Sequence, residues 1–317
     1  MRRPPQQPIE TGGFAVAALS GTVVLWGVVS PLLKSASLSG PALSLHRLWI
    51  GALALVLISW FTREPFRREG AKWSLLAGGV FGLNLLCFVL AIKLTTVANA
   101  TLIGALQPAI VLLVAGRLFG ERVGMREIAA VAVAIVGVTL VIIGSSGTPE
   151  WNPAGDALAL LAVLTYTGYF LISKQQRARV APLPYITAVH VIATFVVLPV
   201  ALAHPGEIVA FEPGDIAIIL VFALVSGTGG QFVVNWAHRY VDVSVSSLLM
   251  LGVPIAASIA AWLMLGESLG PLQLIGGAIT LGGIAMFLRR TSEAAAPMEP
   301  EAHTVPPDAT AAASEAG

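Results

Sequence analysis

The chain has 317 residues, of which 56% are hydrophobic and only 11% charged, and its mean hydropathy is +0.84. A soluble globular domain carries about a quarter charged residues, so this composition excludes a soluble domain with an ordinary polar surface. The net charge is +1 and the basic residues do not cluster, which argues against a nucleic-acid partner. A single cysteine, Cys87, excludes a disulfide framework and a cysteine metal cluster.

The apolar residues gather into segments of the length that crosses a membrane. A helix needs roughly 20 apolar residues to span the hydrocarbon core of a bilayer. The first segment is too long for a signal-peptide core and leads straight into another span, so we interpret it as a permanent helix. We therefore expect an all-α integral membrane protein. The ten expected spans are 14–33, 41–60, 73–92, 97–116, 127–144, 156–173, 185–203, 216–236, 243–265 and 271–288.

The two ends of the chain differ in composition from these spans. Residues 1–12 are rich in Pro and Gln, and residues 291–317 are rich in Ala, Glu and Pro. Segments of this composition bury too little apolar surface to fold. Both are therefore predicted to be disordered tails, and the short loops between spans leave no room for a soluble domain.

The distribution of lysine and arginine predicts the orientation. With the N-terminus inside, the inner segments carry fifteen of these residues and the outer segments two, Lys34 and Lys93. Arg47 lies within a span. Because cytoplasmic loops carry the excess of positive charge, both termini are expected to be cytoplasmic in a cell membrane.

One stretch of sequence occurs twice. LQPAIVLLVAGRLFGE ends at Glu121 and GVPIAASIAAWLMLGE ends at Glu267, and their prolines, Pro108 and Pro254, are likewise 146 residues apart. Each half contains five spans, an odd number, so the second copy enters the membrane from the opposite side. Inverted repeats are typical of secondary transporters, whose site forms between the repeats near the midplane. The expected five-helix repeats are residues 14–144 and 155–289.

These features carry a resemblance to a known family. The five-plus-five arrangement, LWGVVSPLLK in the first span, LHRLW in the second and the two proline-to-Gly-Glu segments resemble EamA-type members of the drug/metabolite transporter superfamily. The resemblance covers nearly all of residues 14–289. It implies export or exchange of a small metabolite, an amino acid or a drug across the cytoplasmic membrane by alternating access. It does not name the substrate.

The spans lack deep carboxylates, which bears on energy coupling. All Asp and Glu residues lie in loops, tails or helix ends. A proton- or sodium-coupled carrier usually needs a membrane-embedded carboxylate. His46 and His190, at similar positions in the second span of each half, could titrate instead. The simpler interpretation is that each histidine bonds a neighbour near a helix end. We therefore expect facilitated movement down the substrate gradient, or at most coupling through histidine.

Polar side chains within the spans are the candidates for a substrate site, because lipid makes them costly. Trp26 and Ser30 share a helix face, as do Gln231 and Asn235. Any one of these groups could equally bridge helices, but as a set they are expected to line a central cavity. Arg47 either packs at a helix end or serves as counter-ion to a substrate carboxylate or phosphate. The candidate substrate-binding residues are Trp26, Ser30, Arg47, Asn84, Asn99, Gln107, Tyr166, Tyr169, Gln231, Asn235 and Ser247.

Four further residues are candidates for a conformational role. Pro108 and Pro254 remove a backbone donor within a span, which kinks a helix or frees a carbonyl for a ligand. Glu121 and Glu267 end the repeated segments.

Other function classes lack their motifs. The sequence contains no H-E-x-x-H, no G-x-S-x-G and no P-loop, so we expect no enzyme activity, no metal and no cofactor. The expected partners are the lipid bilayer and a small-molecule substrate, with no nucleic acid, and the oligomeric state stays open. The alternative is a non-transporting membrane protein such as a sensor or an assembly factor, which would usually add a soluble domain.

Overall fold

The computed structural model describes residues 9–63, 71–94, 103–120, 124–144, 152–177, 180–203, 205–210, 212–265 and 269–295. Within these residues the regular structure is entirely helical. Among the described residues, nine helical segments are long and apolar enough to cross a membrane, and a tenth apolar helix, Gln107–Phe119, is shorter. The expected all-α membrane architecture is confirmed.

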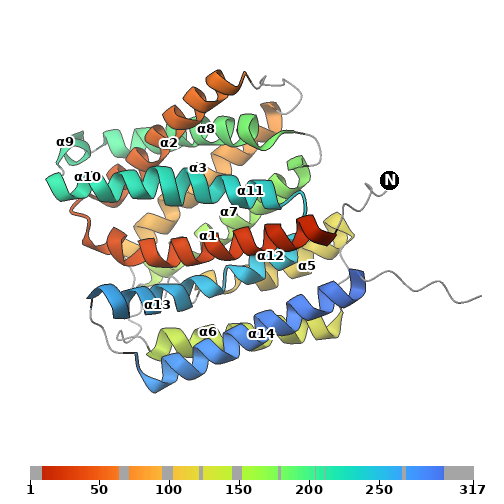
Figure 1. Cartoon of the computed structure of the whole chain (residues 1–317). Coiled ribbons are helices and arrows are strands. Elements are labelled where there is room, and N and C mark those ends of the chain that lie inside the picture. The colour runs from red at the N-terminus through yellow and green to blue at the C-terminus, as the bar shows by residue number, and fades with distance from the viewer. Residues whose placement is uncertain are drawn as a thin grey trace, which may run out of the picture.

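The helices run back and forth along one direction (Figure 1). In chain order they are α1 (Ile9–Ser35), α2 (Gly40–Thr62), α3 (Ala71–Leu94), α5 (Gln107–Phe119), α6 (Met125–Gly144), α7 (Pro153–Arg177), α8 (Pro182–Leu202), α9 (Pro205–Val209), α10 (Pro213–Leu220), η2 (Val221–Gly229), α11 (Gly230–Ala237), α12 (Val243–Leu249), α13 (Gly252–Leu265) and α14 (Pro271–Ala295). The first turn of α1 and the last turn of α14 lie at the same end of the molecule (Figure 1).

The boundaries depart from the sequence-based expectation at both ends of the chain. Residues 9–12 and 291–295, expected in the tails, belong to α1 and α14. The rest of both tails and part of the expected span 97–116 lie outside the described residues.

Two spans are irregular in ways the sequence analysis did not predict. The eighth span is α10, the π-helix η2 and α11 in direct succession. The ninth span is interrupted at residues 250–251, where the backbone makes turns between α12 and α13. Residues 105–106, which precede α5, form the equivalent interruption in the first half.

The contact between α6 and α14 shows how the two halves are related. Thr280 Oγ1 donates a hydrogen bond to the carbonyl oxygen of Ala134 at 3.5 Å, and these residues are 146 positions apart. A Cβ added to Gly137 would meet Thr280, and one added to Gly283 would meet Ala134, so the contact is reciprocal. Because α6 and α14 are antiparallel (Figure 1), a two-fold axis that relates them is perpendicular to both helices. The halves are therefore inverted repeats.

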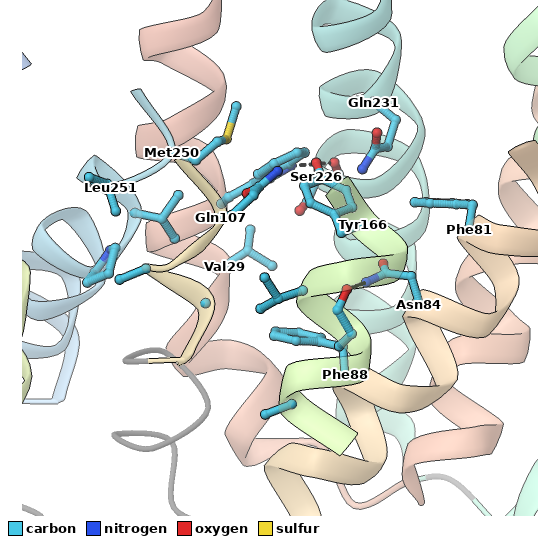
Figure 2. Close-up of a pocket in the computed structure, with 18 of the residues that line it drawn as sticks. Val29, Phe81, Asn84, Phe88, Gln107, Tyr166, Ser226, Gln231, Met250 and Leu251 are labelled. Atoms are coloured by element: carbon cyan, nitrogen blue, oxygen red, sulfur yellow. Dashed lines mark hydrogen bonds between the residues drawn. The ribbon is translucent and has the colours of Figure 1, made fainter. Parts of the chain in front are cut away.

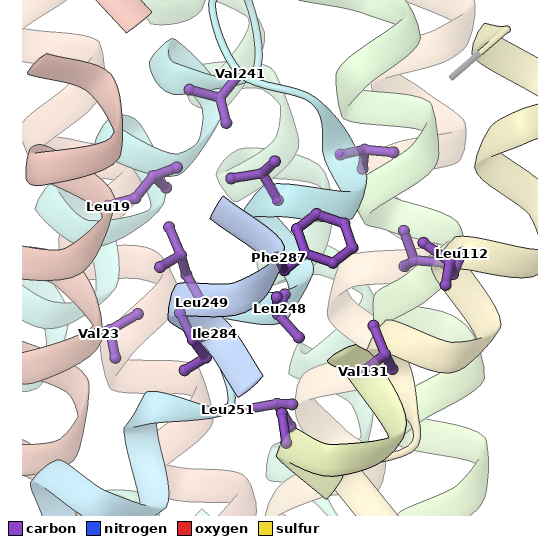
Figure 3. Packing of buried hydrophobic residues seen from close by; sticks show 14 of the residues in the cluster. Leu19, Val23, Leu112, Val131, Val241, Leu248, Leu249, Leu251, Ile284 and Phe287 are labelled. Carbon is purple, nitrogen blue, oxygen red and sulfur yellow. The ribbon is translucent and has the colours of Figure 1, made fainter. Parts of the chain in front are cut away.

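The two halves interlock rather than sit side by side. Helix α1 of the first half packs on α13 of the second, where a Cβ on Gly27 would lie 2.8 Å from the backbone nitrogen of Ala257. Likewise, α7 of the second half packs on α3 of the first. The largest apolar cluster joins residues of both halves, among them Leu19, Leu112 and Phe287 (Figure 3). As a result, the central helices of the two repeats pack against one another in the middle of the molecule.

Candidate functional site

A cavity of about 280 Å³ lies among the central helices of both halves (Figure 2). Its wall is formed by α1, α2, α3 and α7, by η2 and α11, and by the two helix interruptions at 105–106 and 250–251. Of the candidate substrate-binding residues, it brings together Trp26, Arg47, Asn84, Gln107, Tyr166 and Gln231.

The two helix interruptions contribute equivalent residues to this wall. Each pair is separated by 146 positions: Gly104 and Met250, Ala105 and Leu251, Gln107 and Val253, Pro108 and Pro254. The prolines lie in the first turns of α5 and α13, where a missing backbone donor is tolerated. They therefore start helices after a break, which replaces the expected kink within a continuous helix. Discontinuous helices of this kind typically form transporter binding sites.

Arg47 projects from α2 into the bundle. Its side chain is buried, and its guanidinium carbon lies 4.7 Å from the ring centre of Phe222 and 5.9 Å from that of Phe81. Its Nε atom has no hydrogen-bond partner among the described residues. A Cβ on Gly227 would lie 2.9 Å from this Nε, so the glycine makes room for the guanidinium. Arg47 is thus buried among the helices and faces the cavity.

The π-helix η2 supplies a backbone acceptor to the same wall. Trp26 Nε1 donates to the carbonyl oxygen of Ser226 at 2.8 Å, across the boundary between the halves. The wider π turn shifts the backbone hydrogen bonds away from their α-helical partners, and such segments often occur at functional sites. Gly230, at the start of α11, leaves the space that the Trp26 indole occupies.

Two of the candidate amides, Asn84 and Asn235, donate hydrogen bonds to other groups of the protein. Asn84 Nδ2 donates to the carbonyl oxygen of Ala162 at 2.8 Å and so bridges α3 to α7. Asn235 Nδ2 donates to the Tyr169 hydroxyl at 2.7 Å and to the Gln231 carbonyl oxygen at 2.8 Å. The Tyr169 hydroxyl donates to Gln231 Oε1 at 3.4 Å. Gln231 faces the cavity, while Tyr169 and Asn235 form a buried layer behind it.

Two cavity-lining groups besides Arg47 keep unused donors. The side-chain nitrogen of Gln107 is buried without a hydrogen-bond partner among the described residues. The Tyr166 hydroxyl lies near Gln231 without reaching hydrogen-bond geometry, and it too has no partner there. Gln107 comes from α5 and Tyr166 from α7, and both are drawn as lining residues in Figure 2. The cavity therefore offers donors to a ligand.

The remaining candidates lie elsewhere. Ser247 is buried away from the cavity, with its hydroxyl bonded to the Ser244 carbonyl oxygen at 2.9 Å. The side chain of Ser30, and residues Asn99, Glu121 and Glu267, lie outside the described residues.

The two histidines occupy different environments. His46 Nε2 donates to the Ile208 carbonyl oxygen at 2.9 Å and accepts at Nδ1 from Trp49. His190 is fully buried within α8, away from the helix end where the sequence analysis placed it, and its Nδ1 donates to the Ile186 carbonyl oxygen at 3.0 Å.

Comparison with known proteins assigns this architecture. The model of the EamA-like transporter family matches residues 13–143 and again residues 153–289. The chain belongs to the EamA-like transporter family. It is a multi-pass membrane protein of a transporter family, as the resemblance implied.

Several EamA-like relatives have names that mention export. A "probable terminal-alkyne amino-acid exporter" of Streptantibioticus cattleyicolor is 29% identical over 287 residues, which cover 87% of this chain and 94% of the relative. The pseudopaline exporter CntI of Pseudomonas aeruginosa is 23% identical over 257 residues, which cover 80% and 88%. One solved crystal structure superposes with a TM-score of 0.76 at 16% identity, covering 88% of this chain and 98% of its own, and supports the fold alone.

Sequence reasoning placed Trp26 and Tyr166 at the cavity of this EamA-like chain but missed its phenylalanines. Phe81, Phe88 and Phe222 line the cavity, but phenylalanine in a span looks the same in sequence whether it faces lipid or a cavity. A signal for η2 was present in the run SGTGG, residues 226–230, which concentrates glycines where a continuous helix would not need them.

Proposed function

We propose that this protein is a secondary carrier that exports a small amphipathic molecule by alternating access, with the cavity as its substrate site. The observation that carries the proposal is the cavity itself, which lies between inverted repeats and is lined by both interrupted helices. Binding at a repeat interface beside discontinuous helices is the usual arrangement in secondary transporters. Aromatic rings with a few polar donors suit a ligand with an apolar body and a polar end.

The names of two relatives favour export over uptake. One is described as an amino-acid exporter and the other as a pseudopaline exporter. We accordingly propose outward movement of a small metabolite, with amino acids and their derivatives as the first compounds to test.

We further propose that both termini are cytoplasmic in a cell membrane, on the basis of the lysine and arginine distribution. Arg47 lies seven residues after the start of α2, or about 10 Å into the membrane from its outer end. In this orientation the layer formed by Tyr169 and Asn235 lies on the cytoplasmic side of Gln231. Reporter fusions at residue 148 should be active outside the cell, and fusions at residue 180 inside. The reverse pattern would contradict the orientation.

Reconstituted transport tests the carrier function. The purified chain in proteoliposomes should move labelled L-phenylalanine or 3-phenylpropionate with saturable kinetics, and unlabelled compound on the opposite side should accelerate the flux. A sensor or an assembly factor would bind such a compound without moving it. Binding without any flux would therefore contradict the proposal.

A further inference from the structure

We propose that the substrate is a small amphipathic monocarboxylate whose carboxylate binds Arg47 and whose apolar or aromatic body lies against the ring-lined wall. This inference rests on the proposed function only in taking the cavity as the substrate site. It adds the charge of the substrate and the group that recognises it.

Arg47 carries a buried positive charge that no carboxylate of the described residues pairs. Its side chain is 9% exposed, and no Asp or Glu among the described residues contacts it. Its contacts are the faces of Phe222 and Phe81, which attract a cation far less strongly than a carboxylate does. A buried cation is normally paired, so the missing anion is expected to come from a ligand.

The unpartnered polar atoms of the cavity wall also point to an anionic ligand. Arg47 Nε, Gln107 Nε2 and the Tyr166 hydroxyl are the buried polar atoms of the cavity wall that lack partners within the described part of the chain. All three can donate a hydrogen bond. Two acceptors of the wall are engaged, since Trp26 donates to the Ser226 carbonyl and Tyr169 donates to Gln231 Oε1. An arrangement of free donors complements the oxygen atoms of an anion.

The neighbours of Arg47 in η2 also fix the position of its guanidinium. Gly227 leaves space beside the Arg47 side chain, because a Cβ there would lie 2.5 Å from the Phe222 carbonyl oxygen, 2.9 Å from Arg47 Nε and 3.2 Å from Arg47 Cγ. The glycine lies in η2, whose Phe222 ring covers the guanidinium. One irregular segment thus both admits and covers the cation.

The charge and size of the cavity narrow the ligand further. Arg47 is the one cation that lines it within the described residues, so a singly charged anion is matched and a phosphate dianion is not. A volume of about 280 Å³ lies just below the usual range for small-molecule sites, which favours a small ligand. Val253, Leu251 and Phe88 line the same cavity and offer apolar surface.

Three probes of nearly equal shape test the inference: 3-phenylpropionate, 3-phenylpropanamide and 3-phenylpropylamine, which carry charges of about −1, 0 and +1 at neutral pH. Binding to the purified full chain is measured by titration calorimetry, which does not require transport. We expect the acid to bind about 10- to 100-fold more tightly than the amide, and the amine to bind weakest.

Variants assign the preference to Arg47. In Arg47→Gln the acid should lose its advantage over the amide, whereas in Arg117→Gln, a matched change on the exposed face of α5, the advantage should persist. Gly227→Ala should also weaken acid binding, because the added Cβ crowds both the Phe222 carbonyl oxygen of η2 and Arg47 Nε while the charge remains. This variant keeps the test valid if Arg47→Gln does not fold.

The inference is overturned if the acid does not bind, if the three probes bind equally, or if the preference for the acid survives in Arg47→Gln. A clear preference for the acid together with no saturable flux of 3-phenylpropionate would contradict the carrier function instead, and would leave the recognition of the carboxylate standing.

Discussion

Gln107 and Val253 occupy equivalent positions, 146 residues apart, and both line the central cavity. One presents an amide and the other an apolar side chain, so the scaffold is two-fold symmetric while the site is not. Arg47 adds to the asymmetry on the polar side of the wall. A ligand with one polar and one apolar end therefore has a preferred orientation in the cavity.

The unpaired Gln107 amide leads to the first prediction. Gln107→Val makes this pair of positions identical and removes a free donor. We expect the binding free energy of a carboxylate to weaken by about 1.5–3 kcal/mol, roughly 12- to 160-fold in affinity, because one hydrogen bond to a charged group is lost. Titration with 3-phenylpropionate measures the change.

Asn84→Ala is the matched control for Gln107→Val. Its amide already bridges α3 to α7, so its loss should lower stability by roughly 0.6 kcal/mol and leave affinity within about twofold. Equal affinity losses in both variants would show that the free and the engaged amides contribute alike, contrary to this account.

Arg47 is expected to reduce stability while it serves binding. Removing an uncompensated buried charge relieves a desolvation cost of several kcal/mol, whereas each aromatic face returns only about 0.5–2 kcal/mol. Arg47→Gln should therefore raise the melting temperature of the ligand-free protein and abolish stabilisation by 3-phenylpropionate. Arg117→Gln should change neither quantity. A lower melting temperature in Arg47→Gln would mean that the guanidinium contributes to packing.

Helices α6 and α14 approach closely because glycines lie at their contact. In Gly283→Ala the new Cβ would lie 2.8 Å from the backbone nitrogen and 2.9 Å from the Cβ of Ala134, an overpacking that typically costs about 1–3 kcal/mol. The neighbouring Gly282 has open space, so Gly282→Ala should be neutral or stabilising by up to about 1 kcal/mol. Unfolding in mixed micelles compares the two variants, and an equal effect would be inconsistent with the close approach.

Replacing the two histidines tests whether transport is coupled to protons. Because the described spans place no carboxylate in the cavity wall, we expect an imposed proton gradient to have little effect on flux in the His46→Gln, His190→Gln double variant. The measurement is the initial rate in proteoliposomes with and without a pH difference. Strong uphill transport driven by protons in this variant would contradict facilitated movement.

The large features of the fold could be predicted from the sequence because lipid imposes them. Runs of about twenty apolar residues define the spans, and the 146-residue offset between Pro108 and Pro254 predicts the inverted repeats. The interruptions before these prolines and the π-helix η2 could not be predicted, since they depend on which carbonyl each turn selects. Glycines 227, 229 and 230 were the available signal.

The site was harder to anticipate than the fold. Six of the polar or aromatic residues singled out in the spans line the cavity, yet the sequence could not distinguish Asn84, whose donor is used, from Gln107, whose donor is free. That difference depends on a backbone carbonyl of another helix. Phe81 and Phe222 were overlooked because only the packing of α3 and η2 around Arg47 gives them a role.

Blocking the cavity tests the central claim most directly. In a Cys87→Ala background, Met250→Cys places the single thiol of the chain in the cavity wall (Figure 2). The flux of labelled 3-phenylpropionate into proteoliposomes is measured before and after complete reaction with a bulky thiol reagent. The account predicts that modification abolishes flux in Met250→Cys and leaves the Cys87→Ala parent unchanged. Unchanged flux after complete modification of Met250→Cys would show that the substrate does not pass through this cavity.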